Sequence, residues 1–322
     1  MTIPEQSNSD PSLESMTQQF IDSMSGSPPF HTLPPDEGRA AFERLQSAPI
    51  GKPTVTITDL ALPIGPTGSV AVRIARPPAA QDALPVVIYC HGGGWVHGDA
   101  QTHDRLIREI AVGAGVAVVF VGHDRSPQAQ YPVAIEQTYA VLLHLMSHAE
   151  ALNVDATRLA IAGDDTGGAI AAAVTLLVRE RRGPKLDLQV LICPITDADF
   201  DTLSYLRFGD GPWLTRAAMQ RAWDAYLPDA ARRAEPHAAP LRASLDQLAQ
   251  LPEALVIVAE NDVARDDGEN YARRLSDAGV RVTSVRYNGT IHDFAVLNAL
   301  ADTPAARGAI EQIIGALKSA LG

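Results

Sequence analysis

The sequence has 322 residues, of which 46% are hydrophobic, and a formal net charge of −12. A chain of this length can bury a large core, either as one enlarged domain or as a domain with a cap. The acidic balance and the absence of a long Lys/Arg block argue against nucleic acid or an anionic membrane surface as the main partner. No apolar run is long enough to span a bilayer, and the start, MTIPEQSNSDPSLES, does not resemble a secretory signal.

The first 50 residues are polar and contain two helix-like stretches, LESMTQQFIDSM and DEGRAAFERLQS. The second begins with Asp36, which is expected to be its N-cap. Two alternating runs follow, TVTITDLALPI and SVAVRIARP, and these predict antiparallel strands joined by a Gly-Pro-Thr-Gly turn.

Short continuous apolar runs come next, and such runs are typical of strands buried on both faces of a parallel sheet. They are LPVVIYC, GVAVVFVG, RLAIAG, QVLICP, EALVIVAE and RVTSVRY. Helical stretches lie between and after them, namely YPVAIEQTYAVLLHLMSHAEAL, TGGAIAAAVTLLVRERRG, RAAMQRAWDAYL, GENYARRLSDAG and PAARGAIEQIIGALKSAL. The alternation predicts an α/β fold with a mainly parallel sheet, whose ligands bind at the carboxyl ends of the strands.

The two cysteines, Cys90 and Cys193, each end an apolar run. We expect both to be free thiols buried in strands, which is typical of a protein of the reducing cytoplasm.

The stretch IAGDDTGGAI has the Gly-x-x-x-Gly pattern of a nucleophile elbow, with Asp165 at its centre. It lies between an apolar strand and an alanine-rich helix, as an elbow requires. Gly163 and Gly167 flank Asp165 because a side chain would clash in so sharp a turn. The helix N-terminus favours an ionised carboxylate there. The simpler interpretation is an N-cap aspartate.

Three further features occur in the chain order of a catalytic triad with an oxyanion hole. HGGGW, with His91 and Gly92 at its start, follows a strand and can point backbone N–H groups at a ligand. Asp262 ends the strand VIVAEND, and His292 lies in the loop after the last strand. Taken singly, Asp262 could instead cap the helix that starts near Asp266, and His292 could be a surface histidine.

We predict neither a metal nor a cofactor. The other histidines show no metal-ligand spacing and are expected to be structural or solvated; they are His31, His97, His103, His123, His144, His148 and His237. No dinucleotide-binding or phosphate-binding glycine motif occurs.

With these motifs the chain resembles the bacterial hormone-sensitive lipase family of α/β-hydrolases. The resemblance rests on HGGGW, GDDTGG, DADFDTLSY with GPWLTRAAM, LVIVAENDVARDDG and GTIHDF. It implies a doubly wound sheet of about eight strands, with a helical cap from residues 1–50 and part of 200–230 on a catalytic domain of residues 51–322.

The family resemblance also carries implications for the site and its setting. Members are mostly cytoplasmic carboxylesterases that act on short acyl chains, and a homodimer is the family-like expectation. The implied oxyanion hole consists of the N–H groups of Gly93, Gly94 and Thr166. Two stretches depart from the family pattern: the elbow is usually Gly-Asp-Ser-Ala-Gly-Gly, and GHDRSPQ stands where Asp-Tyr-Arg and Pro-Glu usually occur.

An aspartate in the elbow changes the expected chemistry. A carboxylate attacks an ester poorly, but it attacks a saturated electrophilic carbon and forms an alkyl–enzyme ester. His292, oriented by Asp262, would then activate water against that ester. We therefore expect a hydrolase of small apolar molecules that opens epoxides. The acid that protonates the epoxide oxygen is open among Tyr131, Tyr205, Tyr226 and a cap residue.

Three other hypotheses remain. The chain could be a short-chain carboxylesterase inactivated by a serine-to-aspartate change. It could catalyse a cyclisation, elimination or isomerisation with Asp165 or His292 as general base. It could also be a binding module with a ruined site.

Overall fold

A computed structural model describes residues 12–78, 80 and 82–322. Its centre is one eight-stranded sheet with the order β1-β2-β4-β3-β5-β6-β7-β8. The strands are β1 Thr56–Leu62, β2 Val70–Arg76, β3 Leu84–Cys90, β4 Ala117–Gly122, β5 Val154–Asp164, β6 Leu188–Ile192, β7 Glu253–Asn261 and β8 Val282–Ile291.

The first two strands differ from the rest in direction. β1 pairs antiparallel with β2, and β2 pairs antiparallel with β4, whereas β3 to β8 pair in parallel. This confirms the predicted antiparallel start and the mainly parallel sheet that follows. It also agrees with the expected sheet of about eight strands.

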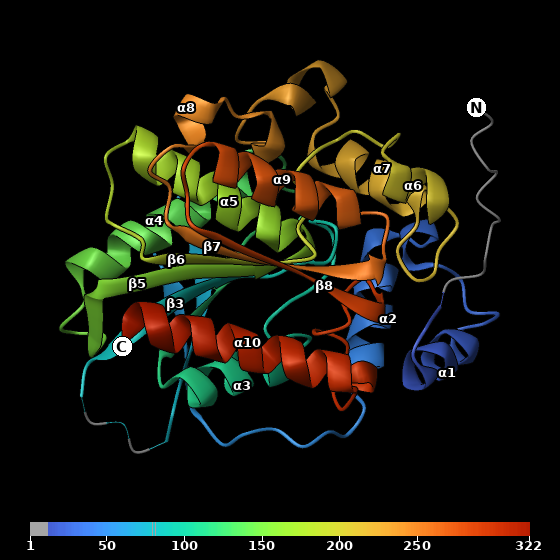
Figure 1. Ribbon diagram of the computed structural model, residues 1–322. Coiled ribbons are helices and arrows are strands. Elements are labelled where there is room, and N and C mark those ends of the chain that lie inside the picture. The colour runs from blue at the N-terminus through green and yellow to red at the C-terminus, as the bar shows by residue number, and fades with distance from the viewer. Residues whose placement is uncertain (1–11, 79, 81) are drawn as a thin grey trace.

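Helices cover both faces of the sheet (Figure 1). The helices are α1 Ser15–Ser23, α2 Pro35–Gln46, α3 Asp104–Ala114, α4 Val133–Ser147, α5 Asp165–Glu180, α6 Leu203–Arg207, α7 Arg216–Tyr226, α8 Leu245–Leu248, α9 Arg265–Asp277 and α10 Pro304–Leu321. Short 3₁₀ turns occur at Phe30–Thr32, Ala230–Ala234, Pro240–Arg242 and Asn298–Leu300. α3 and α10 pack together on one face, while α4, α5 and α9 cover the other.

The helix predictions need two corrections. α2 begins at Pro35, so Asp36 lies in the first turn and is not the N-cap. Proline is favoured at this first position, because its fixed φ suits a helix and its missing N–H has no intrahelical partner there. α3 was not predicted, although its buried face, with Ile107 and Ile110, has helical spacing.

Both cysteines are free and buried, as expected. Cys90 ends β3, but Cys193 lies just beyond β6 with φ +45°, so the prediction that it belongs to a strand is wrong. None of the described helices is long and apolar enough to cross a membrane.

The N-terminal segment is fastened to the loops at the carboxyl ends of the strands. Arg39 on α2 donates from Nε to the carbonyl of Val96 at 2.8 Å and from Nη2 to the carbonyl of Ser126 at 2.9 Å. In Figure 1, α1 and α2 lie on the same side of the molecule as α6 and α7. These two parts of the chain are the described portion of the predicted cap; residues 1–11 lie outside the described residues.

Two adjacent leucines of α4 offer a matched test of the core. Leu142 is fully buried, and its neighbour Leu143 is 43% exposed. We expect Leu142→Ala to lower the free energy of unfolding by about 2–5 kcal/mol, because it leaves a cavity. Leu143→Ala should change it by less than about 0.5 kcal/mol. Urea unfolding monitored by circular dichroism measures both, and equal losses would contradict this packing.

Candidate active site

Asp165 lies at the tip of a sharp turn. β5 ends at Asp164, α5 begins at Asp165, and Asp165 itself has φ +49°. Steric contacts require the two glycines that were predicted to flank Asp165. A Cβ on Gly163 would overlap the carbonyl oxygen of Gly167, and a Cβ on Gly167 would overlap that of Cys90. The stretch is therefore an elbow in geometry, and the N-cap position belongs to Asp164.

One oxygen of the Asp165 carboxylate occupies the predicted oxyanion hole. Gly93 and Gly94, which follow β3 with φ +105° and +62°, donate their N–H groups to Oδ2 at 2.7 and 2.8 Å. The Thr166 hydroxyl donates to the same oxygen at 3.2 Å and accepts from the N–H of Trp95 at 3.0 Å. The side chain in the nucleophile position is thus itself the anion that the hole binds.

His292 follows β8 and stands between two carboxylates. Its Nδ1 is 2.8 Å from Oδ2 of Asp262, and its Nε2 is 3.3 Å from Oδ1 of Asp165. The N–H of Ala264 donates to the other Asp262 oxygen at 2.9 Å. All three side chains are at least 95% buried. The structure therefore brings together the three residues that the sequence proposed as catalytic.

The buried charges stabilise one another. Burial alone would lower the pKa of His292, but the charges of Asp262 and Asp293 and the contact with Asp165 raise it well above its usual value. Burial alone would raise the pKa of Asp165, but His292 and the backbone of Gly94 and Thr166 lower it. These opposite shifts favour an aspartate–imidazolium pair in the resting site.

Asp164 is a site residue that the sequence analysis did not assign. Its Oδ1 accepts from the Tyr89 hydroxyl at 2.6 Å, and its Oδ2 accepts from the N–H of Gly92 at 3.1 Å. His103 Nε2 is 3.2 Å from the same Oδ2. This buried carboxylate holds the glycine run against the elbow. The only sequence signal was its place inside the elbow motif.

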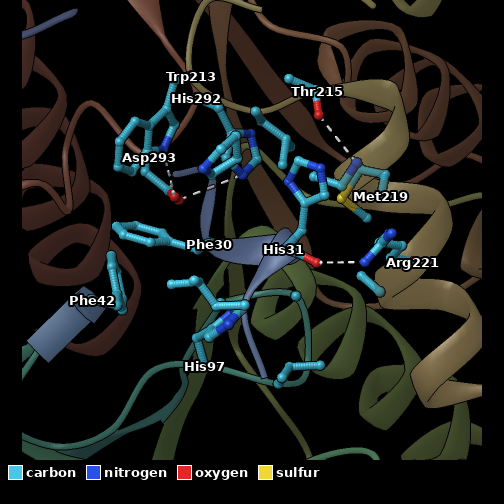
Figure 2. A pocket seen from close by; sticks show the side chains of 18 of the residues that line it. Phe30, His31, Phe42, His97, Trp213, Thr215, Met219, Arg221, His292 and Asp293 are labelled. Atoms are coloured by element: carbon cyan, nitrogen blue, oxygen red, sulfur yellow. Dashed lines mark hydrogen bonds and ion pairs between the residues drawn. The ribbon is translucent and has the colours of Figure 1, made fainter. Parts of the chain in front are cut away.

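A cavity of about 720 Å³ opens above the elbow. Asp165, His292 and the hole glycines lie at its floor, and its walls come from the N-terminal segment and from residues 210–225. Figure 2 shows aromatic side chains from both segments facing it. The apolar part of the wall includes Phe30, Phe42, Trp213, Leu214, Met219 and Ala222. An apolar wall of this size can bury a small ligand.

Two more cavity residues were missed. His97 faces the cavity, and burial lowers its pKa to about 4, so it is neutral there. Asp293 follows His292 and also lines the cavity. Asp293 lies inside GTIHDF, but the motif gave it no role; His97 lies two residues beyond HGGGW, and the expectation that it is merely structural or solvated did not place it in the cavity.

The three tyrosines offered as proton donors do not reach the cavity. Tyr131 donates to Glu235 at 2.9 Å, Tyr226 stacks on Trp95 with ring centroids 4.1 Å apart, and Tyr205 is fully buried elsewhere. None of the three is among the described residues that line the cavity.

Potential metal ligands also meet at His292. Ligand atoms of Cys193, Asp262 and His292 lie within 4.8 Å of one another. His292 Nδ1 and Asp262 Oδ2 are already hydrogen-bonded at 2.8 Å, so an ion between them would have to break that bond. The donor set thus fits a triad better than a metal centre.

A family model described as the alpha/beta hydrolase fold matches residues 87–296. The chain belongs to the α/β-hydrolase fold family. Ethyl acetate hydrolase of Pseudomonas putida is 36% identical over 279 residues, covering 84% of this chain and 86% of the relative. Carboxylesterase NlhH of Mycobacterium tuberculosis is 35% identical over 285 residues, covering 88% of each.

Solved structures agree with this assignment. A thermostable esterase from Pseudomonas putida superposes with a TM-score of 0.95 at 42% identity, covering 98% of this chain and 99% of the other. Carboxyl esterase 2 of the fungus Tuber melanosporum gives 0.89 at 38% identity, covering 96% and 100%. As a member of this family the chain is a hydrolase. These relatives are esterases, which favours the ester alternative over the epoxide hypothesis.

The ion pair at the elbow gives a pH prediction for this α/β-hydrolase. Because Asp165, Asp262 and Asp293 raise the pKa of His292, we expect its ring to carry both protons at pH 7. Removal of one carboxylate in Asp165→Asn should lower that pKa. Two-dimensional ¹⁵N NMR of the histidine rings measures both states, and a neutral His292 ring at pH 7 in the unmutated chain would contradict the assignment.

Proposed function

We propose that the chain carries the site of a short-chain carboxylic ester hydrolase in which Asp165 suppresses acyl transfer. The hole, the His292–Asp262 pair and the apolar cavity are the parts that ester hydrolysis needs. The esterase relatives support the same substrate class.

The observation that carries this proposal is the occupied oxyanion hole. An ester carbonyl has to accept the N–H groups that Asp165 Oδ2 already accepts at 2.7 and 2.8 Å. The charges of Asp262 and Asp293, followed by the contact with Asp165, raise the pKa of His292, so a protonated ring has no free nitrogen to act as a base. A hydroxyl in place of the carboxylate relieves both obstacles, because it vacates the hole and lowers the pKa of His292.

We expect Asp165→Ser to hydrolyse p-nitrophenyl acetate and butyrate faster than the unmutated chain by at least about 10³-fold in kcat/KM, the size of effect that a triad nucleophile has. Steady-state kinetics at pH 8 measure the gain. The matched control is Asp165→Asn, which also removes the charge but supplies no hydroxyl.

Two controls separate the effect of the new hydroxyl from the effect of removing the charge. Asp165→Asn should stay slow, and the double variant Asp165→Ser/His292→Ala should lose what Asp165→Ser gained. An Asp165→Ser chain that binds esters yet hydrolyses them no faster than the unmutated chain would contradict the proposal.

A specific observation favours a second function for the unmutated chain. Asp165 Oδ1 is buried and, unlike Oδ2, accepts no N–H group of the glycine run; it faces Nε2 of His292 at 3.3 Å as an ion pair. This oxygen can attack an electrophilic carbon, such as that of an epoxide, to give an alkyl–enzyme ester. Ester formation neutralises Asp165, which lowers the pKa of His292 and lets the ring activate water. The hole then stabilises the oxyanion that develops on Oδ2.

The alkyl–enzyme ester can be trapped when its hydrolysis is blocked. We expect His292→Gln incubated with styrene oxide to gain the mass of one epoxide, and peptide mapping to locate it on Asp165. Asp165→Asn/His292→Gln is the control and should gain nothing. An adduct absent from Asp165 in His292→Gln would rule out this second function.

Several broader expectations accompany these proposals. We propose residues 1–50 and part of 200–230 as the cap, a homodimer as the assembly and the cytoplasm as the location. The general-base and binding-only hypotheses correspond to a chain inactive on esters and epoxides before and after Asp165→Ser.

A further inference from the structure

Asp293 places a second carboxyl group on the cavity side of His292. Its Oδ1 is 3.5 Å from Nε2, the nitrogen that also faces Asp165. Trp213 approaches its Oδ2 with Nε1 at 3.4 Å, and Figure 2 shows the three side chains meeting at the cavity wall. The Asp293 side chain is 13% exposed, and it lines the cavity, so a ligand can reach it.

The surroundings of Asp293 make both of its forms available near neutral pH: the ionised form raises the pKa of His292, and the protonated form can donate a proton. Burial raises its pKa to about 7, the charges of Asp165 and Asp164 act in the same direction, and His292 and the Trp213 N–H oppose them. A protonated carboxyl group is a hydrogen-bond donor. The surroundings lower the pKa of Asp165 and raise that of Asp293. Two carboxyl groups with such opposite shifts can act as nucleophile and acid in one site.

The turn at Asp293 is made by its backbone and not by its carboxyl group. Asp293 has φ +62°, and its backbone carbonyl accepts the N–H groups of Val296 and Leu297 at 2.8 and 2.9 Å. The backbone thus makes the turn, and the side chain remains directed at His292 and the cavity.

We propose that Asp293 is a further catalytic residue that donates a proton to the oxygen leaving the substrate carbon. This inference rests on the second function above, attack of Asp165 on an electrophilic carbon that carries oxygen. It specifies the substrate class as epoxides, whose ring oxygen becomes a hydroxyl only when an acid supplies a proton.

Each group regains its initial protonation state over one turnover. Asp165 Oδ1 forms a bond to the carbon, the C–O bond of the epoxide breaks with its electron pair on oxygen, and that oxygen takes the proton of Asp293. The imidazolium of His292 then passes its Nε2 proton to the Asp293 carboxylate, 3.5 Å away. This step leaves a neutral ring while Asp165 is esterified.

The neutral ring completes the reaction. His292 takes a proton from water, the hydroxide adds to Cγ of Asp165, and the intermediate expels the product oxygen, which takes that proton back. Asp165 is released as the acid and returns its proton to His292. The site regains an ionised Asp165, a protonated His292 and a protonated Asp293.

The experiment compares two substrates that differ in their need for an acid. Styrene oxide leaves an alkoxide that requires a proton, whereas benzyl bromide leaves bromide, which does not. We would measure the rate of adduct formation on Asp165 by mass spectrometry in His292→Gln and in His292→Gln/Asp293→Asn. Asn tolerates a positive φ and keeps the volume of Asp. Asp277→Asn, an exposed position at the end of α9, is the matched control for loss of a carboxylate.

We expect Asp293→Asn to slow the epoxide reaction by about 10²–10⁴-fold, the contribution of a general acid, and to leave the bromide reaction unchanged within about threefold. The epoxide rate should also fall as rising pH deprotonates Asp293, while the bromide rate should not. Equal rates with and without Asp293 would overturn the proposal, and so would an equal loss with both substrates, which indicates a structural role. If neither substrate labels Asp165 in His292→Gln, the second function itself fails and this inference falls with it.

Discussion

The site depends on the way the Asp165 carboxylate divides its two oxygens. The backbone N–H groups of the glycine run hold one, and the other faces His292. The carboxylate in the nucleophile position therefore occupies the N–H donors that an ester carbonyl oxygen would need. It also fixes the protonation of the histidine, because a buried carboxylate beside the ring favours the imidazolium. Acyl transfer therefore requires that a hydroxyl replace this carboxylate and leave the hole free. Alkyl transfer requires that the carboxylate remain as the nucleophile.

A second buried carboxylate makes this division possible. Asp164 lies behind the elbow and holds the N–H of Gly92, so the glycine run cannot withdraw from Asp165. Tyr89 and His103 bind the remaining sites of the same carboxylate, which satisfies it in a region without water access. The two adjacent aspartates thus have separate tasks: Asp164 positions the donors and Asp165 accepts from them.

Much of the site could be predicted from the sequence, because the order of the motifs and the ends of the strands can be recognised in it. Asp165, Asp262 and His292 each follow a predicted strand, and parallel strands bring such positions to one edge. Asp293 and His97 were not identified, since their roles depend on burial and on facing charges that no local pattern encodes. The tyrosines were misleading for the same reason: the sequence shows a phenol but not whether its hydroxyl faces the cavity. Likewise, Asp36 looked like an N-cap because sequence shows the residue type but not where the first turn begins.

The left-handed backbone at position 165 favours two of the genetic routes between a serine elbow and an aspartate elbow. AGC and AGT codons for serine become the GAC and GAT codons for aspartate only through glycine or asparagine, if bases change one at a time. Glycine and asparagine adopt a positive φ most readily. The turn would therefore persist through either intermediate, and the scaffold could exchange one chemistry for the other without passing through a misfolded protein.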